Sequence, residues 1–307
     1  MQAWVIERIV EKLSGKGYEV ALFSRNCFDI VAKKRGSVLL VKVLLNVDSF
    51  HADQGNDLKK MAEVFSASPV IIGIRGRNFV LKEGSVYERF GIPVVHPNTF
   101  EEILDGHVAL AYSRKGSNMV KFDCDKLKIL RKKDEYSLQQ LSDEIGTSKK
   151  TLYLAEKYGT ISDVILKTIE DLFRVDLRKN IDIFEWDVDV DLKSEVKDSI
   201  EKSIMVNTKR VGFTNFTFKN APANLVLRDP SELVLLDVMK SRISRKHADD
   251  LKRFGDLMHD PKAFVVETKK TIVRKNNIDG VAVITSEEVR KVRSRKEMLD
   301  LIDDRED

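Results

Sequence analysis

The sequence predicts an α+β protein of several domains, in which a central all-α segment lies between two α/β regions. Helical and strand-like patterns alternate over residues 1–120, only helical patterns occur over 122–179, and the alternation returns from residue 206. The returning pattern repeats the first, which indicates an internal duplication. The predicted domains are 1–120 (α/β), 121–180 (all-α), 181–205 (an acidic linker and helix) and 206–307 (α/β).

The first region follows an order typical of an α/β domain. Its amphipathic start, MQAWVIERIVEKL, predicts a helix over residues 3–13. Strands are expected at 18–24, 27–33 and 38–45, a helix at 56–66, and apolar strands at 69–74 and 92–95. Thr99 is then the expected N-cap of a short helix, FEEIL (100–104).

The central segment holds the most specific pattern of the chain, at residues 136–173. Ser137 and Gln140 form a capping box before a helix whose buried face carries Leu138, Leu141 and Ile145. That helix must end at Gly146, in a tight turn that favours a positive φ. A second helix then starts at Ser148, buries Leu152 and Ala155, and exposes Lys149, Lys150, Thr151, Tyr153 and Leu154.

The second α/β region matches the first at an offset of 195 residues. FDIV (28–31) falls on ANLV (223–226), and VLLVKVL (38–44) falls on LVLLDVM (233–239). With small changes of offset, HADQGNDLKK (51–60) answers HADDLKR (247–253), and FEEIL answers SEEVR (286–290). The preserved order favours a duplicated fold, and the alternative is two unrelated α/β modules with similar strands.

Composition limits the classes of function. The chain has 53 Lys and Arg against 49 Asp and Glu, a net charge of +4, so any nucleic-acid surface must be a local patch. Cys27 and Cys124 fit neither a zinc spacing nor a disulfide framework, which favours a reducing cytoplasm. No apolar run approaches the ~20 residues that span a bilayer, so we expect no membrane association.

Two charged residues, Asp29 and Lys42, interrupt apolar strand patterns on either side of a Lys-Lys-Arg-Gly turn. Charged residues in such runs are usually paired or functional. One interpretation is an ion pair across a hairpin, and the other is a metal-dependent catalytic site.

Residues 122–175 resemble the helix-turn-helix class of Cro and phage repressors. The resemblance rests on Leu141, Ile145, Gly146, Ser148, Thr151, Leu152, Glu156 and Gly159. It implies that the second helix enters the major groove of DNA, with Ser148, Lys149, Lys150, Thr151 and Tyr153 contacting bases. The phosphate contacts would be Ser137, Arg131, Lys132 and Lys133. The alternative is a small helical module that only packs between its neighbours.

The stretch 28–44 resembles the core of restriction endonucleases, in which acids hold Mg²⁺ and a lysine assists the attacking water. Asp29 and Lys42 match that pattern, and Glu7 matches an accessory acid, but Leu40 replaces the second carboxylate. The second copy has Asn224, Leu235 and Asp237 at the corresponding positions. Both domains are therefore expected to be inactive and without metal, unless Asp48 or Asp53 substitutes for the missing ligand in the first.

Taken over most of its length, the chain resembles an archaeal family of helix-turn-helix transcriptional regulators. The resemblance implies sequence-specific binding of double-stranded DNA by a homodimer, with no catalysis and no cofactor, and it leaves any small-molecule effector unnamed. The alternatives are a Mg²⁺-dependent nuclease with an Asp29/Lys42 site, targeted by the helix-turn-helix, and a scaffold that does not touch DNA.

Overall fold

The computed structural model describes residues 1–107, 111–114, 117–192, 196, 198–230, 232–239, 245–260, 262–266 and 276–306. The chain divides into two compact units. The first unit comprises Met1–Lys12, Val43–Ser49 and Val70–Val188, and the second comprises Leu13–Lys42, Phe50–Pro69 and Asp189–Asp307. The second unit therefore contains segments from both α/β regions.

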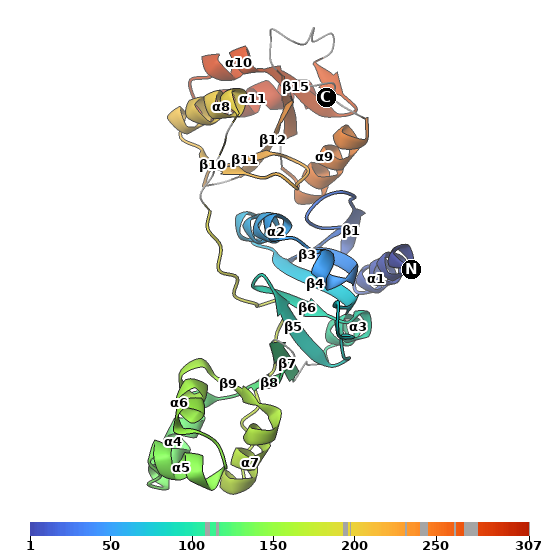
Figure 1. The fold of residues 1–307 in the computed structure, drawn as a ribbon. Coiled ribbons are helices and arrows are strands. Elements are labelled where there is room, and N and C mark those ends of the chain that lie inside the picture. The colour runs from blue at the N-terminus through green and yellow to red at the C-terminus, as the bar shows by residue number, and fades with distance from the viewer. Residues whose placement is uncertain are drawn as a thin grey trace. The chain divides into compact units, whose positions relative to one another are not determined.

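Helices and strands alternate through most of the chain (Figure 1). Its first part contains α1 (Gln2–Gly15), β1 (Glu19–Leu22), β2 (Ile30–Lys34), β3 (Ser37–Asn46), the 3₁₀ helix η1 (Val47–Ser49), α2 (Ala52–Val64), β4 (Ser68–Arg75), β5 (Ser85–Arg89), β6 (Ile92–Val95) and α3 (Pro97–Leu104).

The central part contains β7 (Ala111–Arg114), β8 (Ser117–Lys121), α4 (Cys124–Lys133), α5 (Leu138–Glu144), α6 (Lys149–Tyr158), β9 (Thr160–Ser162) and α7 (Asp163–Phe173). The last part contains α8 (Ser199–Arg210), β10 (Thr214–Thr217), β11 (Leu225–Arg228), β12 (Leu233–Met239), α9 (Arg245–Met258), β13 (Lys262–Val266), β14 (Asn277–Ile278), β15 (Val281–Thr285), α10 (Ser286–Lys291) and α11 (Arg295–Glu306).

The strands form two mixed sheets, and the topology of one recurs in the other. The strand orders are β1-β2-β3-β4-β6-β5-β7-β8-β9 and β10-β11-β12-β13-β15-β14. The hydrogen-bonding register recurs as well. Ile30 pairs with Val41 and Leu225 pairs with Leu236, while Glu19 pairs with Lys33 and Thr214 with Arg228. Both of these pairings in the second sheet thus lie 195 residues after their counterparts in the first.

The prediction of a central all-α bundle is wrong. Strand β9 pairs antiparallel with β8, so that Val120 faces Ile161 and Lys121 faces Thr160, and helices α4–α7 accompany strands of the first sheet. The physical cause lies after α6, which ends at Gly159 with φ 66°. The β-branched Thr160 and Ile161 then favour extended backbone, which adds to β8. Three residues are too few to show a strand periodicity in the sequence.

Two apolar clusters hold together the helices that carry the candidate sites described below. In the first unit, Leu127, Leu141, Leu152 and Ile169 from α4–α7 pack on Ile161 and on other buried side chains of the central part. In the second unit, α8, α10 and α11 pack on the sheet β10–β15 through residues that include Ile204, Val289, Met298 and Ile302. Figure 1 shows these three helices side by side next to β15.

Within the second unit, the two α/β copies make the same contact twice with their roles exchanged. Lys33 of β2 donates to the carbonyls of Leu257 and Met258 at the end of α9, at 2.9 and 3.0 Å. Arg228 of β11 donates to the carbonyls of Glu63 and Val64 at the end of α2, at 3.1 and 2.5 Å. The two cations lie at equivalent strand positions, and each neutralises the negative end of a helix dipole in the other copy.

An aromatic cluster also joins the two copies. The ring of Phe254 on α9 lies 5.9 Å from Phe23, 5.8 Å from Phe28 and 5.0 Å from Phe65, measured between centroids. All four side chains are buried. The copies therefore share an apolar contact, and are not joined by a polar linker alone.

Candidate functional site

Helices α5 and α6 are joined by a short turn whose conformation follows from the local sequence. Ser137 accepts from Gln140 N at 3.2 Å, and the Gln140 side chain accepts from Ser137 N at 2.9 Å, so the predicted capping box is present. Gly146 has φ 68°, in the left-handed region that favours glycine. Ser148 then caps α6 by accepting from Thr151 N at 3.0 Å. The turn between the helices is thus defined by Gly146 and by the capping Ser148, while Ser137 fixes the start of α5.

The residues predicted to contact bases are all exposed, namely Ser148, Lys149, Lys150, Thr151 and Tyr153. The hydroxyls of Ser148 and Thr151 lie 2.8 Å apart, so both are engaged in starting the helix. Lys149 and Lys150 have no ion-pair or hydrogen-bond partner for their ammonium groups within the described part of the chain. Tyr153 is 52% exposed, one turn further along α6. These residues form one polar, cationic surface at the start of α6.

The residues predicted to contact phosphates have different environments. Lys132 and Lys133 are exposed in the last turn of α4, and Ser137 is exposed at the start of α5. Arg131 instead forms a two-pronged ion pair with Glu156 of α6, at 2.6 and 3.1 Å, and its side chain is 12% exposed. It also donates to the carbonyl of Tyr136. Arg131 therefore ties α4 to α6, a role that the sequence analysis did not identify.

Asp29 and Lys42 form a buried ion pair across the β2–β3 hairpin. The Lys42 ammonium lies 3.0 Å from the Asp29 carboxylate and donates to the carbonyl of Asn26 at 2.9 Å. Both residues are 7% exposed. The structure therefore contains the ion pair, which was one of the two interpretations of these residues.

The second copy replaces this pair with a different network. Asp237, at the position of Lys42, accepts from Asn224 N at 3.3 Å and lies 2.8 Å from Nε2 of His247 on α9. The Asn224 side chain bonds the backbone of Val238 in both directions. The hydrogen bond to Asp237 raises the pKa of His247 above its usual value. The second copy therefore has a carboxylate, that of Asp237, at the strand position where the first copy has the ammonium group of Lys42.

Neither arrangement fits a divalent cation. Mg²⁺ needs several oxygen ligands, but Leu40 and Leu235 are fully buried side chains at the positions where a second carboxylate is required. Asp48 is occupied by Arg89 and by the backbone of Arg77, at 2.8 and 2.6 Å. No cluster of three or more His, Cys, Asp or Glu suited to a metal occurs among the described residues.

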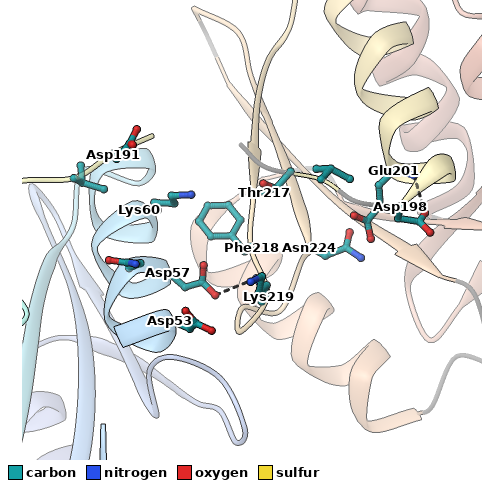
Figure 2. Close-up of a pocket in the computed structure, with 13 residues that line it drawn as sticks. Asp53, Asp57, Lys60, Asp191, Asp198, Glu201, Thr217, Phe218, Lys219 and Asn224 are labelled. Atoms are coloured by element: carbon teal, nitrogen blue, oxygen red, sulfur yellow. Dashed lines mark hydrogen bonds between the residues drawn. The ribbon is translucent and has the colours of Figure 1, made fainter. Parts of the chain in front are cut away.

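A hollow of about 760 Å³ in the second unit has more acids than lysines in its lining (Figure 2). Two of its carboxylates, those of Asp57 and Asp198, hold backbone groups in place. Asp57 accepts from Lys219 N, Asn220 N and the Asn220 amide, at 3.0, 2.8 and 2.9 Å. Asp198 caps α8 through Ile200 N and Glu201 N. The hollow is thus lined by groups that fix a loop and a helix, and its charge disfavours phosphate.

Comparison with known proteins places the chain. Residues 2–108 match the model of the PD-(D/E)XK superfamily domain. A protein of Pyrococcus furiosus named "Putative HTH-type transcriptional regulatory protein" is 32% identical over 97% of this chain and 95% of its own. A protein with the same description from Methanocaldococcus jannaschii is 31% identical, over 98% and 96%. The chain belongs to this archaeal family.

PD-(D/E)XK is a nuclease superfamily, and the Asp29–Lys42 hairpin lies inside the range of the first region that is similar to its model. A relative from Thermococcus kodakarensis with the same description is 30% identical over 97% of the chain, so the likeness extends to the central part and the second copy. No solved structure matches the chain significantly. Within the described residues, no helix has the length and apolarity needed to cross a membrane.

Proposed function

We propose that the chain is a sequence-specific DNA-binding transcriptional regulator without catalytic activity. The single observation that carries the proposal is the start of α6, where Lys149 and Lys150 stand exposed, without a partner among the described residues, beside Ser148, Thr151 and Tyr153. The helices α5 and α6 act as a helix-turn-helix of the repressor type, with α6 in the major groove. The description shared by relatives in the family supports this reading.

In this proposal the two lysines donate to guanine acceptors, and the methyl of Thr151 contacts thymine. Lys132, Lys133 and Ser137 lie at the adjacent ends of α4 and α5 and would bond phosphates, which fixes the register of α6 on the duplex. Arg131 would contribute only the outer edge of its guanidinium to these phosphate contacts, because Glu156 already binds that guanidinium. One short helix reads few base pairs, so the protein would bind as a homodimer.

The test begins with selection of bound sequences from a random pool of duplex DNA by the full chain. A gel shift on the selected duplex should then show at least about a 30-fold loss of affinity for Lys149→Ala combined with Lys150→Ala, since each base contact contributes about 1–3 kcal/mol. Lys157→Ala with Lys167→Ala removes the same charge from the end of α6 and from α7. That control should bind nearly as well as wild type. Equal affinities for both double variants would contradict the proposal.

A second candidate function is a Mg²⁺-dependent nuclease, favoured by the match of residues 2–108 and by Asp29 and Lys42. Incubation of the protein with supercoiled plasmid and Mg²⁺ or Mn²⁺ distinguishes the two. We expect no cleavage, because the buried ammonium of Lys42 occupies the carboxylate that a metal would need. Cleavage that disappears on Asp29→Ala would favour the nuclease.

A further inference from the structure

We propose that a basic cleft on the second copy, formed where α8, α10 and α11 meet, binds the phosphate backbone of duplex DNA. The cleft encloses about 770 Å³ and is lined by Arg210, Val211, Arg290, Lys291, Arg293 and Glu297. It lies wholly in the second unit, whereas α5 and α6 lie in the first. The inference rests on the proposed function for its ligand, DNA, and adds a second contact surface to it.

The cations of the cleft form no ion pair within the described part of the chain. Arg210, Arg290, Lys291 and Arg293 are exposed, and none is in an ion pair with a residue that the structure describes. Glu297, the single acid in the lining, accepts from the backbone N of Arg293 at 2.8 Å and is thereby used to shape the loop before α11. Four gathered positive charges repel one another, and a polyanion relieves that repulsion.

The cleft is also held in shape. The guanidinium of Arg210 donates to the carbonyls of Arg290 and Val292, both at 3.0 Å, and so joins the end of α8 to the segment between α10 and α11. Beneath it, Val292 and Met298 are buried in the core of the second sheet. The backbone that carries these cations is therefore held in place, which reduces the conformational entropy lost when a ligand binds.

The first copy supplies an internal comparison. There the equivalent helices, α1 and α3, are joined by opposite charges, with Arg8 paired to Glu101 and Lys12 paired to Asp105. The corresponding residues of α8 are Ser203 and Asn207, and Lys291 stands where the first copy has Asp105. The duplicated frame thus holds two neutral ion pairs in one copy and a cluster of unpaired cations in the other. Packing of the helices alone does not require that cluster, because the first copy packs without it.

The chemistry favours a nucleic-acid backbone over a small anion. Guanidinium groups bond phosphate oxygens with two parallel N–H groups, and three arginines line the cleft. Lys209 and Lys296 are exposed just beside it, on the ends of α8 and α11, so the positive charge continues beyond one phosphate-sized site. A duplex presents phosphates at such repeated intervals.

The test compares the full chain with the triple variant Arg290→Ala, Lys291→Ala, Arg293→Ala. Fluorescence anisotropy with a labelled duplex is measured over a series of KCl concentrations. Each lost phosphate contact should reduce the slope of log affinity against log salt by about 0.9, so the slope should fall by about 2–3, with at least a tenfold loss of affinity on any duplex sequence. The control, Arg35→Ala with Arg77→Ala and Lys82→Ala, removes the same charge from exposed sites in the first α/β region.

An unchanged slope, or an equal fall in the control, would overturn the inference. So would displacement of the duplex by inorganic phosphate at matched ionic strength, which would indicate a small-anion site. The milder variant Lys291→Glu, with a thermal unfolding curve for every variant, separates loss of contact from loss of fold. If the Lys149 and Lys150 substitutions leave binding intact while the cleft variant loses it, the proposed function fails and the cleft inference stands.

Discussion

At the scale of single residues, the structure explains why two charges interrupt the strands of the first copy. Removing Lys42 and Asp29 from water is costly, and their ion pair offsets much of that cost. Lys42 also binds the carbonyl of Asn26, which fixes the loop before β2. From the sequence, an ion pair and a catalytic site were both open as interpretations. The alternation of apolar residues shows where a charge is buried, but not which group it contacts.

Substitution of Lys42 by Met should lower the free energy of unfolding by about 3–5 kcal/mol, because Asp29 would remain buried without its partner. The double variant Asp29→Asn, Lys42→Met should recover most of that loss, since no uncompensated charge is then buried. Urea unfolding followed by circular dichroism measures both. If the single and double variants were equally stable, the pair would not be the cause.

Glu288 gives a prediction that depends on pH. Arg305 bonds its carboxylate at 2.6 and 3.2 Å, and Thr285 bonds it through N and Oγ1 at 2.8 and 2.9 Å. These bonds lower the pKa of Glu288 from 4.5 to about 2. A lowered pKa means stabilisation that is present above about pH 4.5 and is lost as the pH falls towards 2. Glu288→Gln should flatten this part of the stability profile in acid unfolding curves, whereas an unchanged profile would contradict the assignment.

At the scale of elements, the sequence indicated the two helices around Gly146 well because capping residues are local signals. Ser137, Gln140 and Ser148 lie in the predicted roles, and Ser162 caps α7. The apolar strands β3, β4 and β6 were also expected near their observed positions. Strands β5 and β9 were missed. Strand β9 has three residues, lies at the edge of the sheet and pairs with β8 across the intervening helices α4–α6, whereas β5 is a short strand that pairs with the adjacent β6.

Gly146→Ala should lower stability by about 1 kcal/mol, seen as a fall of about 2–4 °C in Tm. The reason is the backbone alone, because a Cβ at this position would meet nothing within 4 Å, while φ is 68°. Gly15 also has open space around it but no positive φ, so Gly15→Ala should be neutral or slightly stabilising. Equal effects of the two substitutions would show that the turn is not strained.

At the scale of the whole molecule, duplication has placed both halves of a reciprocal contact in one chain. Lys33 and Arg228 each bind the end of a helix in the other copy, and the phenylalanine cluster fills the space between. This face of each copy is therefore used within the chain, and the homodimer in our proposed function would need a different surface. The predicted boundaries at residues 120, 180 and 205 stay predictions.

Lys33→Ala and Arg228→Ala should each lower the free energy of unfolding by about 1–2 kcal/mol, because helix-end carbonyls lose a cationic donor. The two effects should be similar, since the contacts are equivalent. Arg35→Ala removes an exposed cation at the turn of the same hairpin and should change stability by less than about 0.5 kcal/mol. Differential scanning calorimetry measures all three variants, and a loss confined to one cation would contradict the reciprocity.

The sequence by itself determined the elements that depend on neighbours along the chain. These are the caps around α5 and α6, the positive φ of Gly146, and the repeated strand pattern at an offset of 195 residues. Only the tertiary structure decided which groups are paired, and with which partners. It paired Lys42 with Asp29 and Arg131 with Glu156, added β9 to β8, and brought Arg290, Lys291 and Arg293 together in a cleft whose lining contains one acid, Glu297. The physical reason is that the free energy of a charged group depends on the groups that surround it in space. Residues far apart in sequence supply those surroundings.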